Sequence, residues 1–172
     1  MIRHGLTSIM AIGIAFAVGF ACAQPSGDSG LTAEDYNEIQ RLLWTNHQGF
    51  DFATQDHADL WTSTFLPDGE IHNSGRVVAG EDEIREFALS YYRSDPDRKM
   101  RHWTSTFYIT PNDEGATLSA FWYIMTQESG QTGLSIGPAG RYESTVVKTE
   151  DGWRIKKHGV FMEGMVTSLP IM

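Results

Sequence analysis

The feature that most constrains this 172-residue chain is the order of its patterns: helical periodicity comes first and long extended segments follow. Short polar turns that contain glycine join the extended segments in pairs, as in β-hairpins. The segments that we expect to be strands are residues 70–73, 76–79, 100–111, 116–128, 140–149 and 153–165. Helices followed by antiparallel strands indicate an α+β fold, a curved, mixed or antiparallel sheet with helices packed on it.

Three helical segments are predicted before the long strands. The first begins at a Thr32–Asp35 pair that matches a helix-capping box, and Gly49 is expected to break it. A second, short helix opens at Asp56, and a third ends before the Asp-Pro-Asp of residues 95–97. The pattern describes one domain with no internal repeat.

The first 23 residues have the pattern of a secretory signal peptide, with an apolar run and an Ala-Cys-Ala that ends at Ala23. We expect cleavage after Ala23 and a secreted or periplasmic protein; lipid attachment at Cys22 is the weaker alternative. The apolar run is shorter than the roughly 20 residues that span a bilayer, so no stable membrane anchor is expected. Residues 24–30 are expected to be a disordered lead-in, and residues 31–172 the folded domain.

Composition limits the partners and the chemistry. The formal net charge is −9 and no long basic cluster occurs, so nucleic acid, which requires a positive surface, is not an expected partner. Cleavage would remove Cys22, the one cysteine, and with it any disulfide, thiol nucleophile or cysteine ligand. The histidines show no metal-binding spacing, so no metal site is expected. The glycines follow no nucleotide-binding pattern and are expected to form a loop.

Side chains alternate across a strand, and this alternation predicts two faces for the long strands. Even-numbered residues from 100 to 108, His102 among them, should share one face, and odd-numbered residues from 101 to 109 the other. On the next strand Trp122 should oppose Phe121 and Tyr123. Both faces carry large apolar groups, which indicates a sheet wrapped around an aromatic pocket for a small hydrophobic ligand, with Trp103, Phe121, Trp122 and Tyr123 as candidate walls.

Two residues are candidates for acid–base chemistry. Asp51 lies between two phenylalanines beyond the first predicted helix, and His102 lies early in the first long strand. If both point into the pocket, they can act as a proton-transferring pair. Spacing alone leaves open that neither residue is catalytic: Asp51 can cap the next helix or face solvent, and His102 can be a surface or packed residue.

Several motifs together resemble the SnoaL-like group of the NTF2-like superfamily, which includes scytalone dehydratase and bile-acid 7α-dehydratase. The matching segments, spread over residues 31–162, are 101–103 (Arg-His-Trp), 140–143 (Gly-Arg-Tyr-Glu), 151–155 (Asp-Gly-Trp-Arg-Ile) and the spacing of Asp51, Asp56, Leu60 and Phe65 before 67–69 (Pro-Asp-Gly). The resemblance implies a cone-shaped α+β barrel around an apolar pocket, often in a homodimer. It also implies that Asp51 orients His102, which acts as base and then acid on a cyclic substrate with no cofactor.

The chain departs from scytalone dehydratase at positions that would handle the departing water. Phe50 and Asn73 stand where that enzyme has tyrosines, and Thr126 or Gln127 falls near its second histidine. Phe50, Asn73 and Tyr142 are nevertheless expected to contact the substrate. The candidate replacements are Tyr123, Tyr142, Asn46 and His72. Arg141 is expected either to bind an anionic substrate group or to pair with an acid.

These observations predict a cofactor-independent lyase or isomerase that acts on a small hydrophobic cyclic or aromatic compound, with water elimination as the first choice of reaction. The alternative is an exported small-molecule-binding module without catalysis. A third interpretation, a structural partner such as the small subunit of a ring-hydroxylating dioxygenase, conflicts with the expected export. An enzyme requires Asp51 and His102 in one cavity, whereas a structural partner should expose a large apolar patch.

Overall fold

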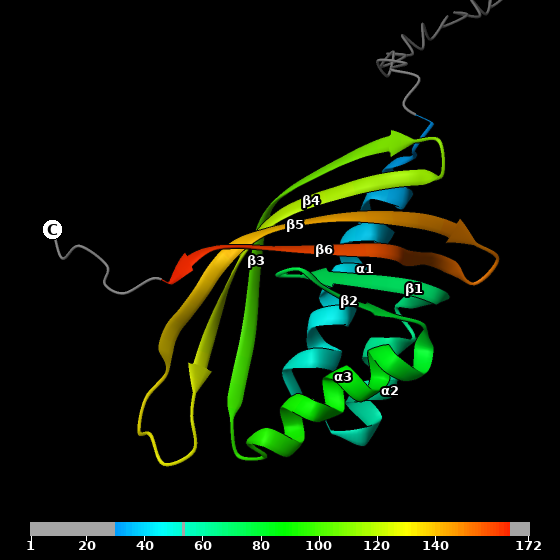
Figure 1. Ribbon diagram of the computed structural model, residues 1–172. Helices are drawn as coiled ribbons and strands as arrows, with labels where there is room; N and C mark the ends of the chain where they lie inside the picture. The colour runs from blue at the N-terminus through cyan, green and yellow to red at the C-terminus, as the bar shows by residue number, and fades with distance from the viewer. Residues whose placement is uncertain (1–29, 53, 166–172) are drawn as a thin grey trace, which may run out of the picture.

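The computed structural model describes residues 30–52 and 54–165 (Figure 1). The predicted signal peptide and, apart from Gly30, the predicted lead-in lie outside the described residues, as do residues 166–172. The elements are α1 Ala33–Phe52, α2 Gln55–Thr62, β1 Phe65–Asn73, β2 Arg76–Ala79, α3 Glu81–Ser94, β3 Lys99–Asn112, β4 Gly115–Gln127, β5 Ser135–Thr149 and β6 Gly152–Met165. Their order is the predicted one. No helix in this part of the chain has the length and apolar character needed to cross a bilayer.

The strands form one six-stranded sheet in the order β2-β1-β6-β5-β4-β3. Neighbours are antiparallel except β1 and β6, which run parallel, so the sheet is mixed. It is not closed, because β2 and β3 are its two edges. The long strands bend over α1, while α2 and α3 lie below the short hairpin (Figure 1). The result is the predicted α+β cone, with helices supplying the side that the sheet leaves open.

The start of α1 is fixed by the predicted capping pair. The backbone N–H and the hydroxyl of Thr32 donate to Asp35 Oδ2 at 2.8 and 2.7 Å, and the Asp35 N–H donates back to the hydroxyl. Asp35 Oδ1 also accepts from Lys148 at 2.6 Å and from the Trp153 indole at 3.1 Å. The Lys148 ammonium, followed by the Thr32 donors, holds the pKa of Asp35 well below its usual range. This carboxylate therefore joins the start of α1 to the end of β5 and the start of β6.

The prediction that Gly49 ends the first helix is wrong, because α1 continues to Phe52. A Cβ at Gly49 would lie 2.5 Å from the backbone nitrogen of Trp61, so the missing side chain lets α2 pack directly on α1. The glycine serves helix packing at a small cost in helix propensity. One consequence reaches the site: residues 47 and 51 lie on the same face of a continuous helix.

The predicted alternation along β3 holds only for its first half. The register with β4 shifts between Ser105 and Tyr108, and Thr106 has φ +55°, which marks a β-bulge. Beyond this bulge the odd-numbered residues face inward, so Ile109 is buried and Tyr108 is exposed. The bulge reverses the face of every residue after it, which the sequence pattern could not show.

Candidate active site

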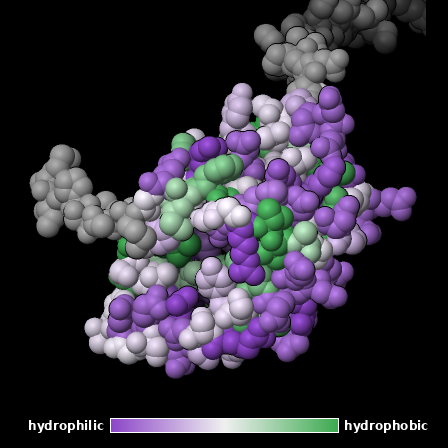
Figure 2. Space-filling model, viewed as in Figure 1, coloured by the Kyte–Doolittle hydropathy of each residue, from purple (hydrophilic) through white to green (hydrophobic). Residues whose placement is uncertain are grey.

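A cavity of about 440 Å³ lies between the helices and the concave face of the sheet. Its walls come from α1, α2, α3 and all the strands but β2, and most are aromatic or aliphatic. Phe50 packs on Trp61 and Tyr91 with ring centroids 4.9 and 5.2 Å apart. In the space-filling view, apolar surface gathers near the centre of the face shown, among hydrophilic residues (Figure 2). The cavity suits a small, largely apolar molecule.

The structure brings Asp51 and His102 together, and of the two His102 lines this cavity. Asp51 stands near the end of α1 and His102 in the first half of β3. Asp51 Oδ1 lies 2.5 Å from His102 Nδ1, and the backbone N–H of His102 donates to both carboxylate oxygens at 3.1 and 2.9 Å. Both side chains are 7 % exposed. The carboxylate thus holds the main chain and the ring of His102 at once, and the ring lines the cavity.

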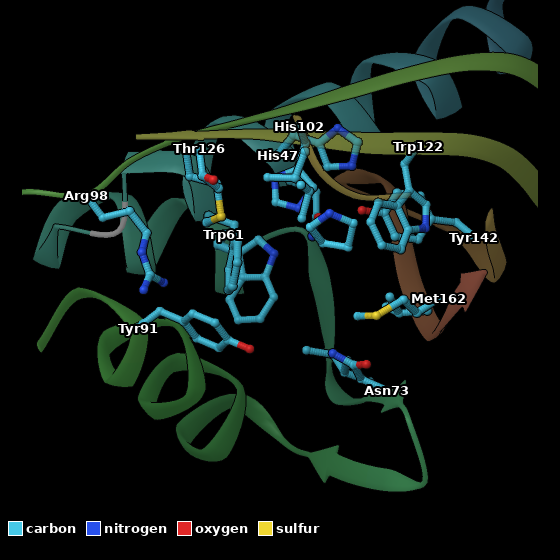
Figure 3. Close-up of a pocket in the computed structure, with 18 of the residues that line it drawn as sticks. His47, Trp61, Asn73, Tyr91, Arg98, His102, Trp122, Thr126, Tyr142 and Met162 are labelled. Atoms are coloured by element: carbon cyan, nitrogen blue, oxygen red, sulfur yellow. The ribbon is translucent and has the colours of Figure 1, made fainter. Parts of the chain in front are cut away.

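His47 lies one helical turn before Asp51 and stacks on His102, with ring centroids 5.1 Å apart and planes 19° from parallel. Figure 3 shows the two imidazoles beside each other at the cavity wall. Phe50 meets the same His102 ring edge-on at 5.8 Å. The orientation of the His102 ring is therefore fixed by the hydrogen bond to Asp51 and by ring contacts with His47 and Phe50.

His158 and Tyr142 complete the polar end of the cavity. His158 Nδ1 pairs with the Ser144 hydroxyl at 2.8 Å, and its ring lies 4.7 Å from Tyr142. Burial, with the nearby His102, lowers the pKa of His158 to about 4. Burial, followed by the charges of His102 and His158, lowers the pKa of His47 well below its usual value. Burial, with the Asp51 charge, raises the pKa of Tyr142, so its phenol stays protonated.

Four of the predicted binding residues line the cavity: Phe50, Asn73, Trp122 and Tyr142. Trp122 and Tyr142 stack with centroids 5.4 Å apart. Two further residues named in the sequence analysis also line the cavity. They are Asn46, a candidate replacement for a water-holding tyrosine, and Thr126, which falls near the second histidine of scytalone dehydratase. The amide of Asn46 donates to the Thr64 hydroxyl at 2.8 Å, so this amide already has a structural partner.

Four other predicted binding residues lie away from the cavity: Trp103, Phe121, Tyr123 and Arg141. Strand register explains this, because Trp103 pairs with Tyr123, and Phe121 with Arg141, on the face opposite His102 and Trp122. Of the two alternatives for Arg141, the structure shows acid pairing: its guanidinium lies 3.2 Å from Glu143 and 3.7 Å from Glu163. Tyr123 and Arg141 therefore cannot touch a ligand in this cavity.

His72, another candidate replacement, also lies outside this cavity. Its Nε2 pairs with Glu70 at 2.6 Å, and the two side chains are 33 % and 45 % exposed. It lines a separate shallow hollow near the β1–β2 turn. His72 and Glu70 are a second histidine–carboxylate pair, but one formed two residues apart at the surface.

An ion pair stands at the end of the cavity away from the histidines. Arg98 Nε donates to Glu128 at 3.0 Å and lies 3.9 Å from Asp95. The backbone N–H of Ser129 also donates to Asp95. Figure 3 shows Arg98 beside Tyr91, far from Trp122 and Tyr142. These contacts tie the β4–β5 connection to the turn before β3.

His47 and His158 were not selected from the sequence, because the histidines show no metal-binding spacing. The i, i+4 spacing of His47 and Asp51 was the available signal, but the expected helix break at Gly49 concealed it. Within residues 30–52 and 54–165, no three His, Cys, Asp or Glu side chains gather in a way that could hold a metal ion.

Comparisons with known proteins identify the family and support the fold. The family model described as "SnoaL-like domain" matches residues 31–158. The anthranilate 1,2-dioxygenase small subunit of Burkholderia cepacia is 24 % identical over 131 residues, covering 75 % of this chain and 77 % of that subunit. A candidate scytalone dehydratase from Novosphingobium aromaticivorans superposes with a TM-score of 0.65 at 17 % identity, covering 80 % of this chain and 89 % of that one. A Catenulispora acidiphila protein solved in complex with S-DNPA superposes with a TM-score of 0.67 at 21 % identity, covering 77 % and 96 %.

Proposed function

We propose that this chain, which belongs to the SnoaL-like domain family within the NTF2-like superfamily, is a lyase or isomerase that uses a histidine of its own for acid–base chemistry. Its substrate would be a small hydrophobic cyclic or aromatic compound. The observation that carries the proposal is the Asp51–His102 pair, with Oδ1 and Nδ1 2.5 Å apart, whose imidazole lines a largely apolar cavity.

The chemistry follows from how the pair is held. A carboxylate can only accept hydrogen bonds, so the ring nitrogen facing Asp51 donates, and in the neutral imidazole the other ring nitrogen, Nε2, has the lone pair. Asp51 thereby fixes both the tautomer and the orientation of His102. A general base so positioned contributes about 10²–10⁴ in rate.

Three reactions use this arrangement in the same way. In an elimination, His102 Nε2 takes the proton from a carbon next to a carbonyl, the C–O bond on the neighbouring carbon breaks, and the proton leaves with the hydroxyl as water. In an isomerisation the proton returns to another carbon. In an aldol-type closure the carbanion attacks a carbonyl, and the alkoxide that forms takes the proton back from the imidazole. The proton carrier in each case is the imidazole, so the step itself requires no metal or organic cofactor. Water elimination is our first choice because a SnoaL-fold neighbour is a candidate scytalone dehydratase.

The common first step can be tested before the substrate is known. Ring ketones such as 1-tetralone would be incubated with the protein in D₂O, and loss of the α-proton signal followed by NMR. We expect enzyme-dependent exchange in the wild type, a decrease of about 10²–10⁴ in His102→Gln and a clear decrease in Asp51→Asn. His72→Gln removes the other histidine with a carboxylate partner and is the matched control, expected to exchange like the wild type.

The alternative is an exported ligand-binding module without catalysis, favoured by the largely apolar lining of the cavity. Binding of the ring ketones with no exchange in any variant would support this module and contradict the enzyme. Export itself stays a prediction from the first 23 residues and is tested by comparing periplasmic and cytoplasmic fractions of cells that produce the whole chain.

A further inference from the structure

Tyr142 brings to the cavity a phenol that the proposed reaction does not use. Its side chain lines the cavity and is only 3 % exposed. Among the described residues, the side-chain polar atoms that are both unpaired and sealed from solvent are His47 Nε2 and Trp122 Nε1. The Tyr142 hydroxyl also has no hydrogen-bond partner in this part of the chain, and it is not one of the sealed atoms. Its oxygen is therefore reachable from the cavity that the side chain lines.

The phenol lies at the end of the cavity that holds the reactive histidine. The rings of His102 and Tyr142 both lie against the ring of His47, with centroids 5.1 and 5.5 Å from it. Figure 3 shows the Tyr142 ring reaching from its strand toward the two imidazoles. Nε2 of His102, too, is unpaired among the described residues and is not a sealed atom. The same end of the cavity thus presents an imidazole nitrogen and a phenol hydroxyl.

The Tyr142 ring is fixed in position and keeps its proton. It stacks on Trp122 at 5.4 Å, with planes 21° from parallel, and its centroid is 4.7 Å from that of His158. Burial, followed by the Asp51 charge, raises the pKa of Tyr142, so the hydroxyl remains a hydrogen-bond donor at neutral pH. A donor already held in place stabilises developing charge without the cost of reorganisation.

Proton removal by His102 creates the charge that such a donor can stabilise. When the C–H bond beside a carbonyl breaks, the proton goes to His102 Nε2 and the electron pair moves onto the carbonyl oxygen, which becomes an enolate. Asp51 stabilises the imidazolium, but a carboxylate cannot stabilise the enolate. Arg98, which also lines the cavity, is paired with Glu128 and stands far from Tyr142 (Figure 3). The enolate oxygen therefore requires a donor from the histidine end of the cavity.

We propose that the Tyr142 hydroxyl is a second catalytic group, which donates a hydrogen bond to the carbonyl oxygen of the ring substrate and stabilises the enolate formed by His102. This inference rests on the proposed function and adds to it a residue and a substrate class: cyclic ketones with a hydrogen on the carbon beside the carbonyl. The base and the donor contact two different atoms of one substrate. Their placement selects which ring carbon loses its proton.

Exchange of the α-protons of 1-tetralone in D₂O, followed by NMR, tests the donor through catalysis. Tyr142→Phe keeps the stacked ring and removes only the hydroxyl, so it should lower kcat for exchange about 10²–10³-fold, as the loss of one such donor does. KM should change much less, because the hydrogen bond strengthens as charge develops. Equal free energies of unfolding by urea would show that the variant keeps its fold.

Two matched variants remove a phenol elsewhere. Tyr123→Phe makes the same change on the outer face of the sheet, away from the cavity, and should exchange like the wild type. Tyr91→Phe removes the other phenol that lines the cavity, beside Arg98, and should lower exchange far less than Tyr142→Phe does (Figure 3).

A binding measurement tests the same contact without catalysis. The wild type should bind 1-tetralone about tenfold more tightly than tetralin, which lacks the oxygen, because one hydrogen bond to an unpaired buried group has roughly that effect. Tyr142→Phe should abolish this preference and leave the affinity for tetralin unchanged. The infrared carbonyl band of bound 1-tetralone should lie at lower frequency in the wild type than in Tyr142→Phe, since a donated hydrogen bond weakens the C=O bond.

The outcomes separate the donor from the function on which it rests. Exchange that is unchanged in Tyr142→Phe, or reduced equally in Tyr91→Phe, would overturn the donor and leave the acid–base function of His102 standing. Binding of 1-tetralone without exchange in the wild type would overturn the function and the catalytic role together. If neither compound binds, the proposed hydrophobic ligand fails, and the donor fails with it.

Discussion

The two faces of strands β3 to β6 carry similar kinds of side chains but differ greatly in their exposure to solvent. The inner face carries Trp122 and Tyr142, both nearly inaccessible, and the histidines of the candidate site. The outer face carries Trp103, Phe121 and Phe161, which are 55 %, 51 % and 43 % exposed. Each face has large aromatic side chains, so hydrophobicity does not distinguish them. The helices do, because they cover one face and leave the other to solvent (Figure 1).

The same difference separates the two histidine–carboxylate pairs. His72 and Glu70 belong to one strand and lie at the surface, whereas His102 and Asp51 come from a strand and a helix 51 positions apart and are buried. Exposed pairs are screened by water, while a buried pair keeps one geometry and a stronger mutual field. Cover by the helices turns a common pairing into a candidate reactive site.

The largest expected change in stability is at Trp122 on the inner face, and Trp103 on the outer face is the comparison. Trp122→Ala removes an indole that stacks on Tyr142 in the core and should destabilise the fold by about 3–5 kcal/mol. Trp103→Ala removes a half-exposed indole and should cost less than about 1 kcal/mol. Urea denaturation at neutral pH measures both. Similar costs would mean that the outer face is also covered in solution.

The second effect concerns acid and the buried histidines. The pKa of His158 is lowered to about 4 in the folded protein, against about 6.5 when unfolded, so between these values the unfolded chain binds a proton that the folded one does not. Stability should therefore fall as the pH drops from about 6.5 to about 4, by at most about 3 kcal/mol from this residue. His47, whose pKa is lowered for similar reasons, acts in the same direction.

The measurement is the free energy of unfolding by urea at intervals from pH 7.5 to pH 4. His158→Gln, which can still hydrogen-bond Ser144, should flatten the slope in this range. The control is Asp35→Asn, which should leave the slope in this pH range unchanged. Because the pKa of Asp35 in the folded protein lies well below its usual value, protonation of this carboxylate destabilises the fold only at a lower pH than protonation of the histidines does. An unchanged slope in His158→Gln would contradict a neutral, buried His158.

The smallest expected effect on the fold comes from the outer face. Phe121→Glu places a charge opposite Arg141 on the neighbouring strand, and at a half-exposed site should change stability by less than about 0.5 kcal/mol. If the homodimer that the family resemblance implies forms through this face, the same variant should be a monomer. Molar mass by light scattering measures this, with Thr132→Glu in the β4–β5 connection as control. A wild-type monomer would contradict the homodimer.

The order of elements and the capping of α1 were predictable because they depend on neighbours in sequence. Thr32 and Asp35 are three residues apart, and the hairpin turns lie between adjacent strands. The face of a residue was predictable only while the strand stayed regular. The bulge near Thr106 reversed the pattern along β3, and no local signal marked it.

The candidate site shows the same division. The residue types and the resemblance selected Asp51 and His102, and the structure brings these two together. The sequence pattern did not select His47, because Gly49 was expected to end the helix, whereas in the structure it allows close contact with Trp61 within a continuous α1. Trp103, Phe121 and Tyr123 were chosen for their aromatic rings, and strand register placed them on the wrong side of the sheet.

By itself, then, the sequence determined which segments are helices and strands, since periodicity and turn residues act over a few neighbours. Tertiary structure alone decided which of two aromatic faces encloses a cavity and which histidines meet there. Those outcomes depend on helix cover, a bulge and the close approach of α1 and α2. Each depends on how whole elements pack against one another, and such packing leaves no periodic trace in the sequence.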